Sequence, residues 1–177
     1  MAEVVLITGG SRSGKSRYAQ ELAQESAGEK LFVATCPRVD GEMDERIRRH
    51  REDRAGRGWR TVEEEVDLEG VLGREGGIMV LVDCLTLWIN NLMYHNGREE
   101  DNIGENEIEF RTRELLRVCA EREGRVVFVT NEVGLGIVPE NQLARRYRDL
   151  VGRCNQTLAA GADKVVFMVS GLPLTLK

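Results

Sequence analysis

The sequence predicts a three-layer α/β/α domain built on a mostly parallel sheet. Short apolar runs rich in β-branched residues alternate along the chain with longer amphipathic segments. Nearly continuous apolar runs are typical of strands buried on both faces, and the segments between them are typical of covering helices. The chain has 177 residues, enough for one ordinary domain and too few for two. Residues 1–177 are therefore expected to form a single domain.

Five apolar runs are the predicted strands. Each is short, and the β-branched residues within it favour a strand over a helix. The first run leads into a glycine-rich segment, and each later run follows a helical candidate or a turn. The predicted strands are Val4–Thr8, Leu31–Thr35, Ile78–Val82, Val126–Thr130 and Val165–Val169.

Four segments between these runs are the predicted helices: Ser16–Ser26, residues 40–54, Glu105–Glu123 and Glu140–Ala160. The last is the clearest, with Pro139 as its expected first residue and Gly161 as its C-terminal stop. Gly56–Gly77 and Tyr94–Gly104 give no clear prediction. The apolar side of the last helix is formed by Leu143, Tyr147, Leu150, Val151, Cys154 and Leu158.

Composition narrows the class of protein. Apolar residues make up 41% of the chain, charged residues 31%, and the formal net charge is -5, as suits a soluble globular protein. No signal pattern and no long apolar run occur, so we expect a cytoplasmic protein without a membrane span. The acidic balance argues against a nucleic-acid partner. Free thiols are expected at the four scattered cysteines, which are Cys36, Cys84, Cys119 and Cys154.

A phosphate-binding motif follows the first predicted strand. Residues Gly9–Ser16, "GGSRSGKS", match Gly-x-x-x-x-Gly-Lys-Ser in full. Its glycines let successive N–H groups face a phosphate, while Lys15 reaches the β- and γ-phosphates. A chance glycine-rich turn is the alternative, but a strand before and a helix after favour a P-loop (RecA-like) α/β/α fold. The predicted nucleotide contacts are Gly9, Gly10, Ser11, Arg12, Ser13, Gly14, Lys15 and Ser16.

A second group is needed to hold the metal ion of a nucleotide triphosphate. Asp83 ends the apolar run Ile78–Val82, the position of a metal-binding aspartate in P-loop proteins. The alternative is an ordinary aspartate that caps a turn. We expect Ser16 and Asp83 to be the protein ligands of Mg²⁺.

His50 lies in an arginine-rich segment, "DERIRRHREDR". If residues 40–54 are helical, Arg46 and Arg54 lie one turn before and after His50. Their guanidinium groups could hold phosphate oxygens and keep the imidazole unprotonated, and therefore nucleophilic, because a further positive charge is unfavourable there. A solvated basic helix is the alternative, and the charge pattern alone favours it. The other histidine, His95, is assigned no role.

Seven stretches together indicate a family. They are "TGGSRSGKS" at Thr8–Ser16, "ATC" at Ala34–Cys36, "RIRRHREDR" at Arg46–Arg54, "WRTVEE" at Trp59–Glu64, "VDCLTLWINNL" at Val82–Leu92, "TNEVGLGIVPENQLARRYRDLVGRCNQTLA" at Thr130–Ala159 and "VSG" at Val169–Gly171. With them the chain resembles the bifunctional adenosylcobinamide kinase / adenosylcobinamide-phosphate guanylyltransferases of cobalamin biosynthesis. The resemblance covers essentially the whole chain, and the His50 segment and "NEVGLGIVPEN" are its most specific parts.

The resemblance implies two reactions. Adenosylcobinamide is phosphorylated with ATP or GTP, and GMP is then transferred from GTP to adenosylcobinamide phosphate through a covalent guanylyl-histidine. It places the nucleophile at His50 and implies a homotrimer with nucleotide sites near subunit boundaries. Positions matching those around the guanine nucleotide are Ala34, Thr35, Cys36, Arg51, Glu52, Asp53, Arg54, Glu63 and Asp83.

Glu63 also suits guanine on chemical grounds, because a carboxylate can accept from guanine N1–H and the exocyclic amine. A solvated acidic patch over Glu63–Glu65 is the alternative. Two positions depart from the family pattern: Ala55 where many members have proline, and Arg49 where some have a second histidine. They affect the expected loop shape more than the chemistry. Gly41, Gly56 and Gly58 suggest hinges by which the His50 helix could move relative to the phosphate loop.

Three other functions fit parts of the sequence. A plain small-molecule kinase would need Lys15 and Ser16 but not His50. A non-enzymatic nucleotide-binding regulator would bind nucleotide with little turnover. A recombinase-like DNA-binding ATPase is disfavoured by the net charge of -5.

Overall fold

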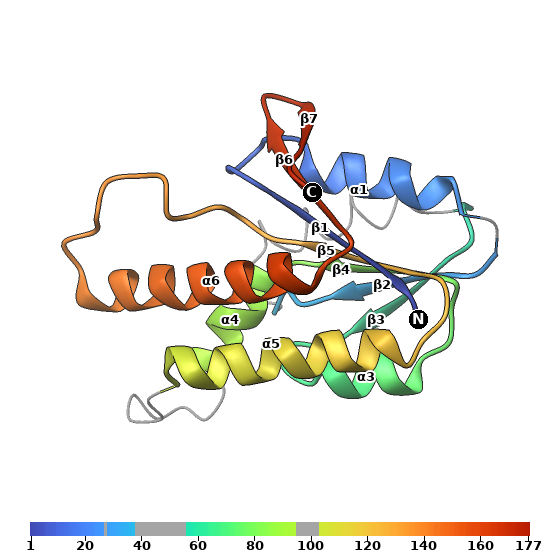
Figure 1. Ribbon diagram of the computed structural model, residues 1–177, viewed down its shortest axis with the longest axis horizontal. Helices are drawn as coiled ribbons and strands as arrows, with labels where there is room; N and C mark the ends of the chain where they lie inside the picture. Colours follow the sequence, from blue (N-terminus) through green and yellow to red (C-terminus); the bar gives the residue numbers. More distant parts are fainter. Residues whose placement is uncertain (27, 38–55, 95–102) are drawn as a thin grey trace.

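The computed structural model describes residues 1–26, 28–37, 56–94 and 103–177. The predicted helix over residues 40–54, with His50 and the predicted contacts Arg51, Glu52, Asp53 and Arg54, lies outside the described residues. The described chain folds around a sheet of seven strands with helices on both faces (Figure 1).

The sheet is mostly parallel, as predicted. Its strand order is β3-β2-β4-β5-β1-β6-β7. Neighbouring strands pair in parallel as far as β6, and β7 runs antiparallel beside β6. The strands are β1 (Glu3–Gly9), β2 (Lys30–Ala34), β3 (Trp59–Glu63), β4 (Met79–Asp83), β5 (Arg125–Val129), β6 (Lys164–Val169) and β7 (Leu172–Thr175).

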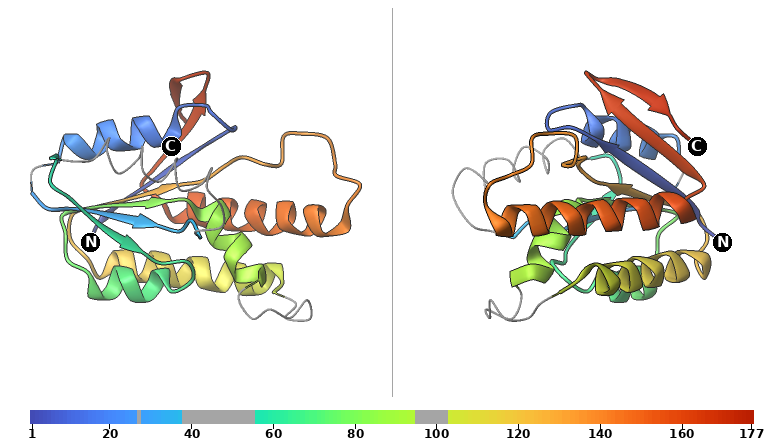
Figure 2. Two further views of the ribbon diagram at one scale, coloured as in Figure 1. Left: turned by 180° about the vertical axis from the view of Figure 1, so that it is seen from behind. Right: turned by 60° about the vertical axis from the view of Figure 1, so that its left-hand side comes forward.

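Helices form the two outer layers (Figure 2). Alternate side chains of β1 enter different cores, as the two-residue period of a strand requires. Leu6 packs in the core below α3 to α6, whereas Val5 and Ile7 pack in the core below α1. None of the helices in the described part of the chain could cross a lipid bilayer. The helices are α1 (Lys15–Gln24) on one face and α3 (Leu68–Arg74), α4 (Leu85–Tyr94), α5 (Glu105–Ala120) and α6 (Gln142–Gly161) on the other.

The five predicted strands are all present, and three of the predicted helices correspond to α1, α5 and α6. The expected start of α6 at Pro139 was wrong. The side chain of Asn141 accepts a hydrogen bond from the N–H of Ala144 at 3.0 Å, and this N-cap places the first helical residue at Gln142. The helix ends at Gly161, the expected stop residue and one residue beyond the predicted end at Ala160.

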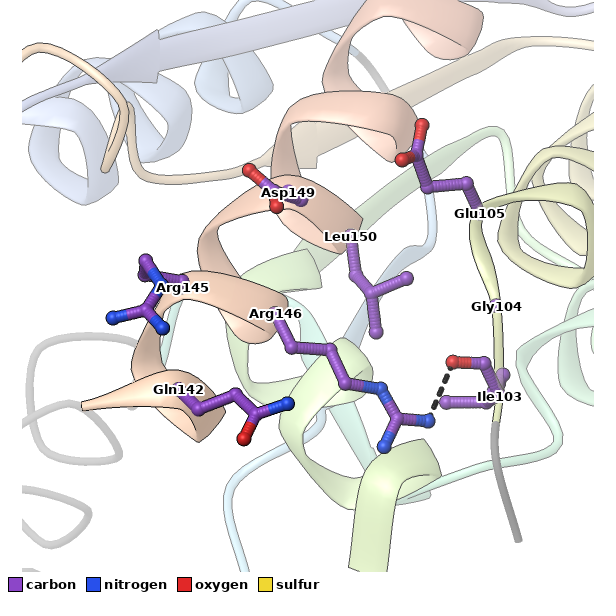
Figure 3. Close-up of a pocket in the computed structure, with 8 residues that line it drawn as sticks. All are labelled: Ile103, Gly104, Glu105, Gln142, Arg145, Arg146, Asp149 and Leu150. Carbon is purple, nitrogen blue, oxygen red and sulfur yellow. Dashed lines mark hydrogen bonds between the residues drawn. The ribbon is translucent and has the colours of Figure 1, made fainter. Parts of the chain in front are cut away.

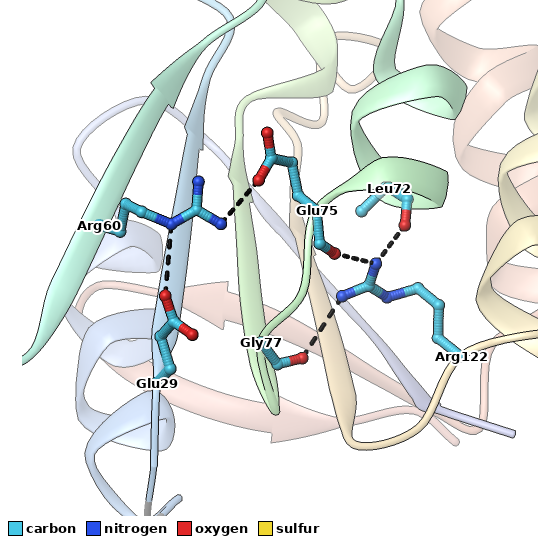
Figure 4. A network of polar contacts seen from close by, with 6 residues as sticks. All are labelled: Glu29, Arg60, Leu72, Glu75, Gly77 and Arg122. Carbon is cyan, nitrogen blue, oxygen red and sulfur yellow. Dashed lines mark hydrogen bonds and ion pairs between the residues drawn. The ribbon is translucent and has the colours of Figure 1, made fainter.

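Two arginines brace the edge of the sheet where the parallel strands begin (Figure 4). Arg60 on β3 pairs with Glu75 at 2.7 Å and with Glu29 at 3.3 Å. Arg122, which precedes β5, donates to the carbonyl oxygens of Leu72 and Glu75, the second at 2.7 Å. This edge is thereby tied to the C-terminal end of α3.

The opposite edge of the sheet gathers the carboxyl ends of the parallel strands. The register places Ala34 beside Asp83, Asp83 beside Val129 and Val129 beside Ile7. Ligands bind outside the carboxyl ends of strands in open α/β sheets. The predicted site residues that the structure describes follow or end these strands.

Candidate active site

The phosphate loop connects β1 to α1 and has an irregular backbone. Gly9, Arg12 and Gly14 have φ values of 151°, 56° and 95°. A Cβ atom on Gly9 would lie 2.4 Å from the carbonyl oxygen of Met168 on β6. Only glycine fits this position, because both the backbone angle and the close approach of β6 exclude a side chain.

Lys15 lies across the inside of this loop. Its side chain is buried, with 7% exposed, and Nζ donates to the carbonyl oxygen of Gly10 at 2.6 Å and to Oγ of Ser13 at 3.4 Å. A buried ammonium group must be paired. These loop acceptors pair the ammonium group within the predicted phosphate loop.

Both strands that flank β1 brace the loop. The N–H of Gly171, in the turn between β6 and β7, donates to the carbonyl oxygen of Ser13 at 3.0 Å. On the other side, the N–H of Glu132, just after β5, donates to the carbonyl oxygen of Gly9 at 3.0 Å. The phosphate loop therefore keeps its shape through contacts with both neighbouring segments.

Ser16 and Asp83 are brought to the same edge of the sheet. Ser16 is in the first turn of α1, which packs against β4, and Asp83 is the last residue of β4. No group of three or more His, Cys, Asp or Glu side chains in the described residues could hold a metal ion. A hydroxyl and a carboxylate suit Mg²⁺ only when substrate phosphates supply further oxygens, so the donor set fits a nucleotide-bound cation.

Thr35 follows β2, and its hydroxyl forms hydrogen bonds to the backbone of another segment of the protein. Its side chain is fully buried, and Oγ1 accepts from the N–H of Cys84 and donates to its carbonyl oxygen, both at 2.8 Å. Asn91 on α4 donates to the carbonyl oxygen of Thr35 at 2.8 Å. Thr35 thus fixes the residue next to Asp83, while Ala34 and Cys36 beside it are half-buried.

Glu63 ends the edge strand β3 and is exposed, beside Ala34 in the register. Its neighbour Glu64 is not a solvated acid. Oε1 of Glu64 accepts from the N–H groups of Val66 and Asp67, both at 2.9 Å. The acidic run is therefore partly structural, and Glu63 remains the predicted guanine contact within it.

A polar cluster next to Asp83 had no counterpart among the sequence predictions. Oγ1 of Thr86 lies 3.0 Å from Sγ of Cys84 and accepts from Nδ2 of Asn131 at 3.1 Å. The hydroxyl of Tyr147 on α6 donates to the carbonyl oxygen of Thr86 at 3.1 Å. Burial raises the pKa of Cys84 to about 11 and that of Tyr147 to about 12. Both groups are neutral near pH 7, so the cluster positions α4 and the segment after β5.

The loop from Asn131 to Asn141 leaves the carboxyl end of β5 and reaches beyond the start of α6 (Figure 1). Arg148 on α6 donates to the carbonyl oxygen of Gly134 at 2.7 Å. The loop also exposes apolar side chains, with Leu135 at 78% and Ile137 at 97% exposure. It is anchored at its base and presents apolar groups at its tip.

A pocket of about 400 Å³ lies between the starts of α5 and α6. Figure 3 shows Arg146 reaching across it to the backbone of Ile103, to which it donates at 2.8 Å. None of the predicted nucleotide contacts lines this pocket. Its walls are Ile103, Gly104, Glu105, Gln142, Arg145, Arg146, Asp149 and Leu150.

Comparisons with known proteins agree on a family. The model of the family described as "Cobinamide kinase / cobinamide phosphate guanyltransferase" matches residues 5–176. The bifunctional adenosylcobalamin biosynthesis protein CobP of Pseudomonas aeruginosa is 44% identical over 174 residues, 97% of this chain and 96% of that protein. The bifunctional adenosylcobalamin biosynthesis protein CobU of Escherichia coli is 40% identical over 182 residues, which cover 98% of this chain and 99% of that protein.

Two solved structures share the fold. The flagellar accessory protein FlaH from Methanocaldococcus jannaschii aligns with a TM-score of 0.55 at 13% identity, covering 99% of this chain and 78% of that one. The RadB recombinase aligns with a TM-score of 0.53 at 16% identity, and the alignment covers 93% of this chain and 73% of that one. These likenesses concern the fold alone, and the predicted P-loop (RecA-like) α/β/α fold is confirmed.

Proposed function

The chain belongs to the cobinamide kinase / cobinamide phosphate guanyltransferase family, and from this membership we propose that it is a bifunctional enzyme of adenosylcobalamin biosynthesis. It phosphorylates adenosylcobinamide with ATP or GTP, and it then transfers GMP from GTP to adenosylcobinamide phosphate. The products of the second step are adenosylcobinamide-GDP and pyrophosphate. The observation that carries this proposal is the complete phosphate loop between β1 and α1 in a chain that matches the family almost end to end.

In the kinase step, the phosphate loop binds the triphosphate. Backbone N–H groups of residues 9–16 and the N-terminus of α1 face the phosphates. The ammonium group of Lys15 exchanges its loop acceptors for phosphate oxygens. The loop acceptors are neutral whereas phosphate oxygens carry negative charge, so the added attraction between opposite charges favours the bound nucleotide.

Ser16 and Asp83 hold Mg²⁺ when the nucleotide is bound. Their oxygen donors and their shared edge of the sheet support this assignment. The ion supplies charge neutralisation to the triphosphate. The protein contributes the two ligands and the rigid strand end that positions Asp83.

In the guanylyl step, His50 attacks the α-phosphorus of GTP and releases pyrophosphate, and adenosylcobinamide phosphate then displaces the imidazole. The flanking Arg46 and Arg54 hold phosphate oxygens and keep the imidazole unprotonated. Support for this role comes from the sequence pattern and from family membership.

The guanine and ribose lie against the ends of β2 and β3. Glu63 accepts hydrogen bonds from guanine. Thr35 acts indirectly, because its two hydrogen bonds to the backbone of Cys84 fix the strand end that carries Asp83. The remaining contacts are proposed at Ala34, Cys36, Arg51, Glu52, Asp53 and Arg54.

We further propose that residues 1–177 act as a single catalytic domain in a cytoplasmic homotrimer. All four cysteines are free thiols in the structure, in keeping with a reducing compartment. The exposed apolar tip with Leu135 and Ile137 is the surface offered for contact between subunits. Small molecules, and not nucleic acids, are the proposed partners.

The test of this function is the intact mass of the protein after incubation with GTP and Mg²⁺. Wild type is expected to gain one GMP through an acid-labile, base-stable bond, as a phosphoramidate requires. His50→Ala is expected to gain nothing. His95→Ala, which removes the other histidine of the chain, is the matched control and is expected to be labelled like wild type.

Equal labelling of His50→Ala and wild type would contradict the assignment of the nucleophile. An unlabelled wild type that still phosphorylates adenosylcobinamide would indicate a plain kinase. An unlabelled wild type with no turnover would indicate a nucleotide-binding regulator. Retention of DNA at moderate salt would point instead to a DNA-binding ATPase.

A further inference from the structure

Glu132 lies between the two groups assigned to the nucleotide. It follows β5, and β5 lies between β4, which ends in Asp83, and β1, which leads into the phosphate loop. Its backbone N–H donates to the carbonyl oxygen of Gly9 at 3.0 Å. The first residue of the phosphate motif is therefore in direct contact with Glu132.

Only one oxygen of the Glu132 carboxylate accepts a hydrogen bond from the described residues. Oε1 accepts from the N–H of Gly134 at 2.8 Å, and the carbonyl oxygen of Gly134 accepts from Arg148 on α6 at 2.7 Å. A Cβ atom on residue 134 would lie 2.9 Å from Oε1 of Glu132, so this glycine allows the close contact. The side chain is half-buried, and within the described residues no cation pairs with it.

The other carboxylates at this edge are less suitable for the same position. Asp83 ends β4 and is assigned to the cation. Glu63 ends β3, which is separated from β1 by β2, β4 and β5. Glu64 uses its carboxylate to cap the backbone of Val66 and Asp67. Among these acids, Glu132 is the one whose backbone contacts the phosphate loop and whose carboxylate has one oxygen without a described hydrogen bond.

Transfer of a γ-phosphoryl group to an alcohol requires a base. The acceptor oxygen must lose its proton as it bonds to phosphorus, and an aspartate commonly takes that proton in kinases that act on hydroxyl groups. The base has to lie near the γ-phosphate, where the acceptor arrives. The backbone contact between Glu132 and Gly9 places this acid at the start of the phosphate loop, next to the predicted triphosphate site.

We propose that Glu132 is the general base of the kinase step, an inference that rests on the function proposed above. The acceptor hydroxyl donates to the free oxygen of Glu132, and its own oxygen attacks the γ-phosphorus. The new O–P bond forms while the bond from the γ-phosphorus to the β–γ bridging oxygen breaks. The electron pair of that bond leaves with the nucleoside diphosphate, and the proton passes from Glu132 to water.

Two substitutions separate this role from a structural one. Glu132→Gln keeps an oxygen that accepts from Gly134 and removes only the basicity, whereas Glu132→Ala removes both. Both variants are expected to lower the kcat of phosphorylation about 100- to 10,000-fold, the usual contribution of a general base. If the carboxylate only shaped the loop, Glu132→Gln would work like wild type and only Glu132→Ala would be impaired, and that result would overturn the proposal.

The second reaction provides the internal control. With adenosylcobinamide phosphate supplied directly, both variants are expected to form adenosylcobinamide-GDP within a few-fold of the wild-type rate. The acceptor in that step is an ionised phosphate oxygen, which needs no general base to remove a proton. Glu140→Gln, an exposed acid in the same loop, is expected to match wild type in both steps. Equal loss of both steps in Glu132→Gln would contradict the assignment.

Failure of the proposed function would look different. A wild-type protein that phosphorylates nothing refutes the kinase itself, and the role of Glu132 with it. A wild-type kinase whose Glu132→Gln variant is fully active refutes only the role of Glu132. Thermal unfolding of each variant, expected within a few degrees of wild type for Glu132→Gln, shows that the fold is retained.

Discussion

The hydroxyl of Thr35 binds both backbone polar groups of Cys84: it accepts from the N–H and donates to the carbonyl oxygen, each at 2.8 Å. The two residues are 49 positions apart in the chain. They join the segment after β2 to the segment after β4. The strand end that carries Asp83 is thereby fixed by a side chain on its neighbour.

Thr35→Val is expected to destabilise the protein. Valine has a similar shape but leaves the N–H of Cys84 without this partner, at a cost of about 1–3 kcal/mol for an unsatisfied buried group, whereas the carbonyl oxygen of Cys84 still accepts from the N–H of Trp88 at 3.2 Å. Urea unfolding would measure the loss. Thr61→Val, on the exposed face of β3, is the matched control, and an equal effect of the two substitutions would contradict the argument.

Gly9→Ala is expected to abolish nucleotide binding. Its Cβ would meet the carbonyl oxygen of Met168 at 2.4 Å, so either β6 or the phosphate loop must shift. Calorimetric titration with a non-hydrolysable GTP analogue would detect the loss. Gly152→Ala in α6 has no atom within 4 Å of the added Cβ and is expected to bind normally, with stability raised by about 0.5–1 kcal/mol.

Lys15→Met is expected to weaken nucleotide binding roughly 10- to 150-fold, because each hydrogen bond to a charged group contributes about 1.5–3 kcal/mol. Methionine keeps most of the apolar stem and removes the ammonium group. The same titration measures the change. Lys30→Met, at the start of β2 and thus at the opposite edge of the sheet, should leave the affinity unchanged.

Alkylation of the native protein by iodoacetamide at pH 8 is expected mainly at Cys36. Burial raises the pKa of Cys84 and Cys154 to about 11 and that of Cys119 to about 12, so their reactive thiolate is scarce. Peptide masses after brief labelling would show the order. All four cysteines should react in 8 M urea, and fast native labelling of Cys154 would contradict the structure.

Stability is expected to fall at alkaline pH through the same thiols. Burial raises the pKa of Cys154 from 9.0 to about 11. The free energy that the neutral buried thiol contributes to stability is therefore complete below pH 9 and is lost as the pH rises through 11. At pH 10 the loss is on the order of 1 kcal/mol. The difference in unfolding free energy between wild type and Cys154→Ala should shrink from pH 8 to pH 10 by that amount.

The buried parallel strands were predictable because each is apolar on both faces. β3 and β7 were not, since they are edge strands whose side chains are largely exposed. The helix α4 gave no periodic signal because polar as well as apolar residues are buried along it, among them Thr86, Trp88 and Asn91. The helix α3 is only seven residues long, too short for a periodic pattern.

The candidate site was predictable where a motif specifies it. The phosphate loop and Asp83 follow from residue types at fixed spacing next to apolar runs. The roles of Thr35 and Glu132 depend on partners far away in the sequence, Cys84 for the first and Gly9 for the second. Neither contact leaves a trace in local sequence, so only the folded chain reveals them.

The bracing by Arg60 and Arg122 has a consequence for protein engineering. These arginines fasten the edge where the strands begin to the end of α3, whereas the phosphate loop and the segment after β5 occupy the other edge. Loops at that second edge can be exchanged or lengthened to accept a different alcohol without touching the braces that hold the frame. The braces at the strand starts are thus separate from the contacts that fix the phosphate loop and the strand end carrying Asp83.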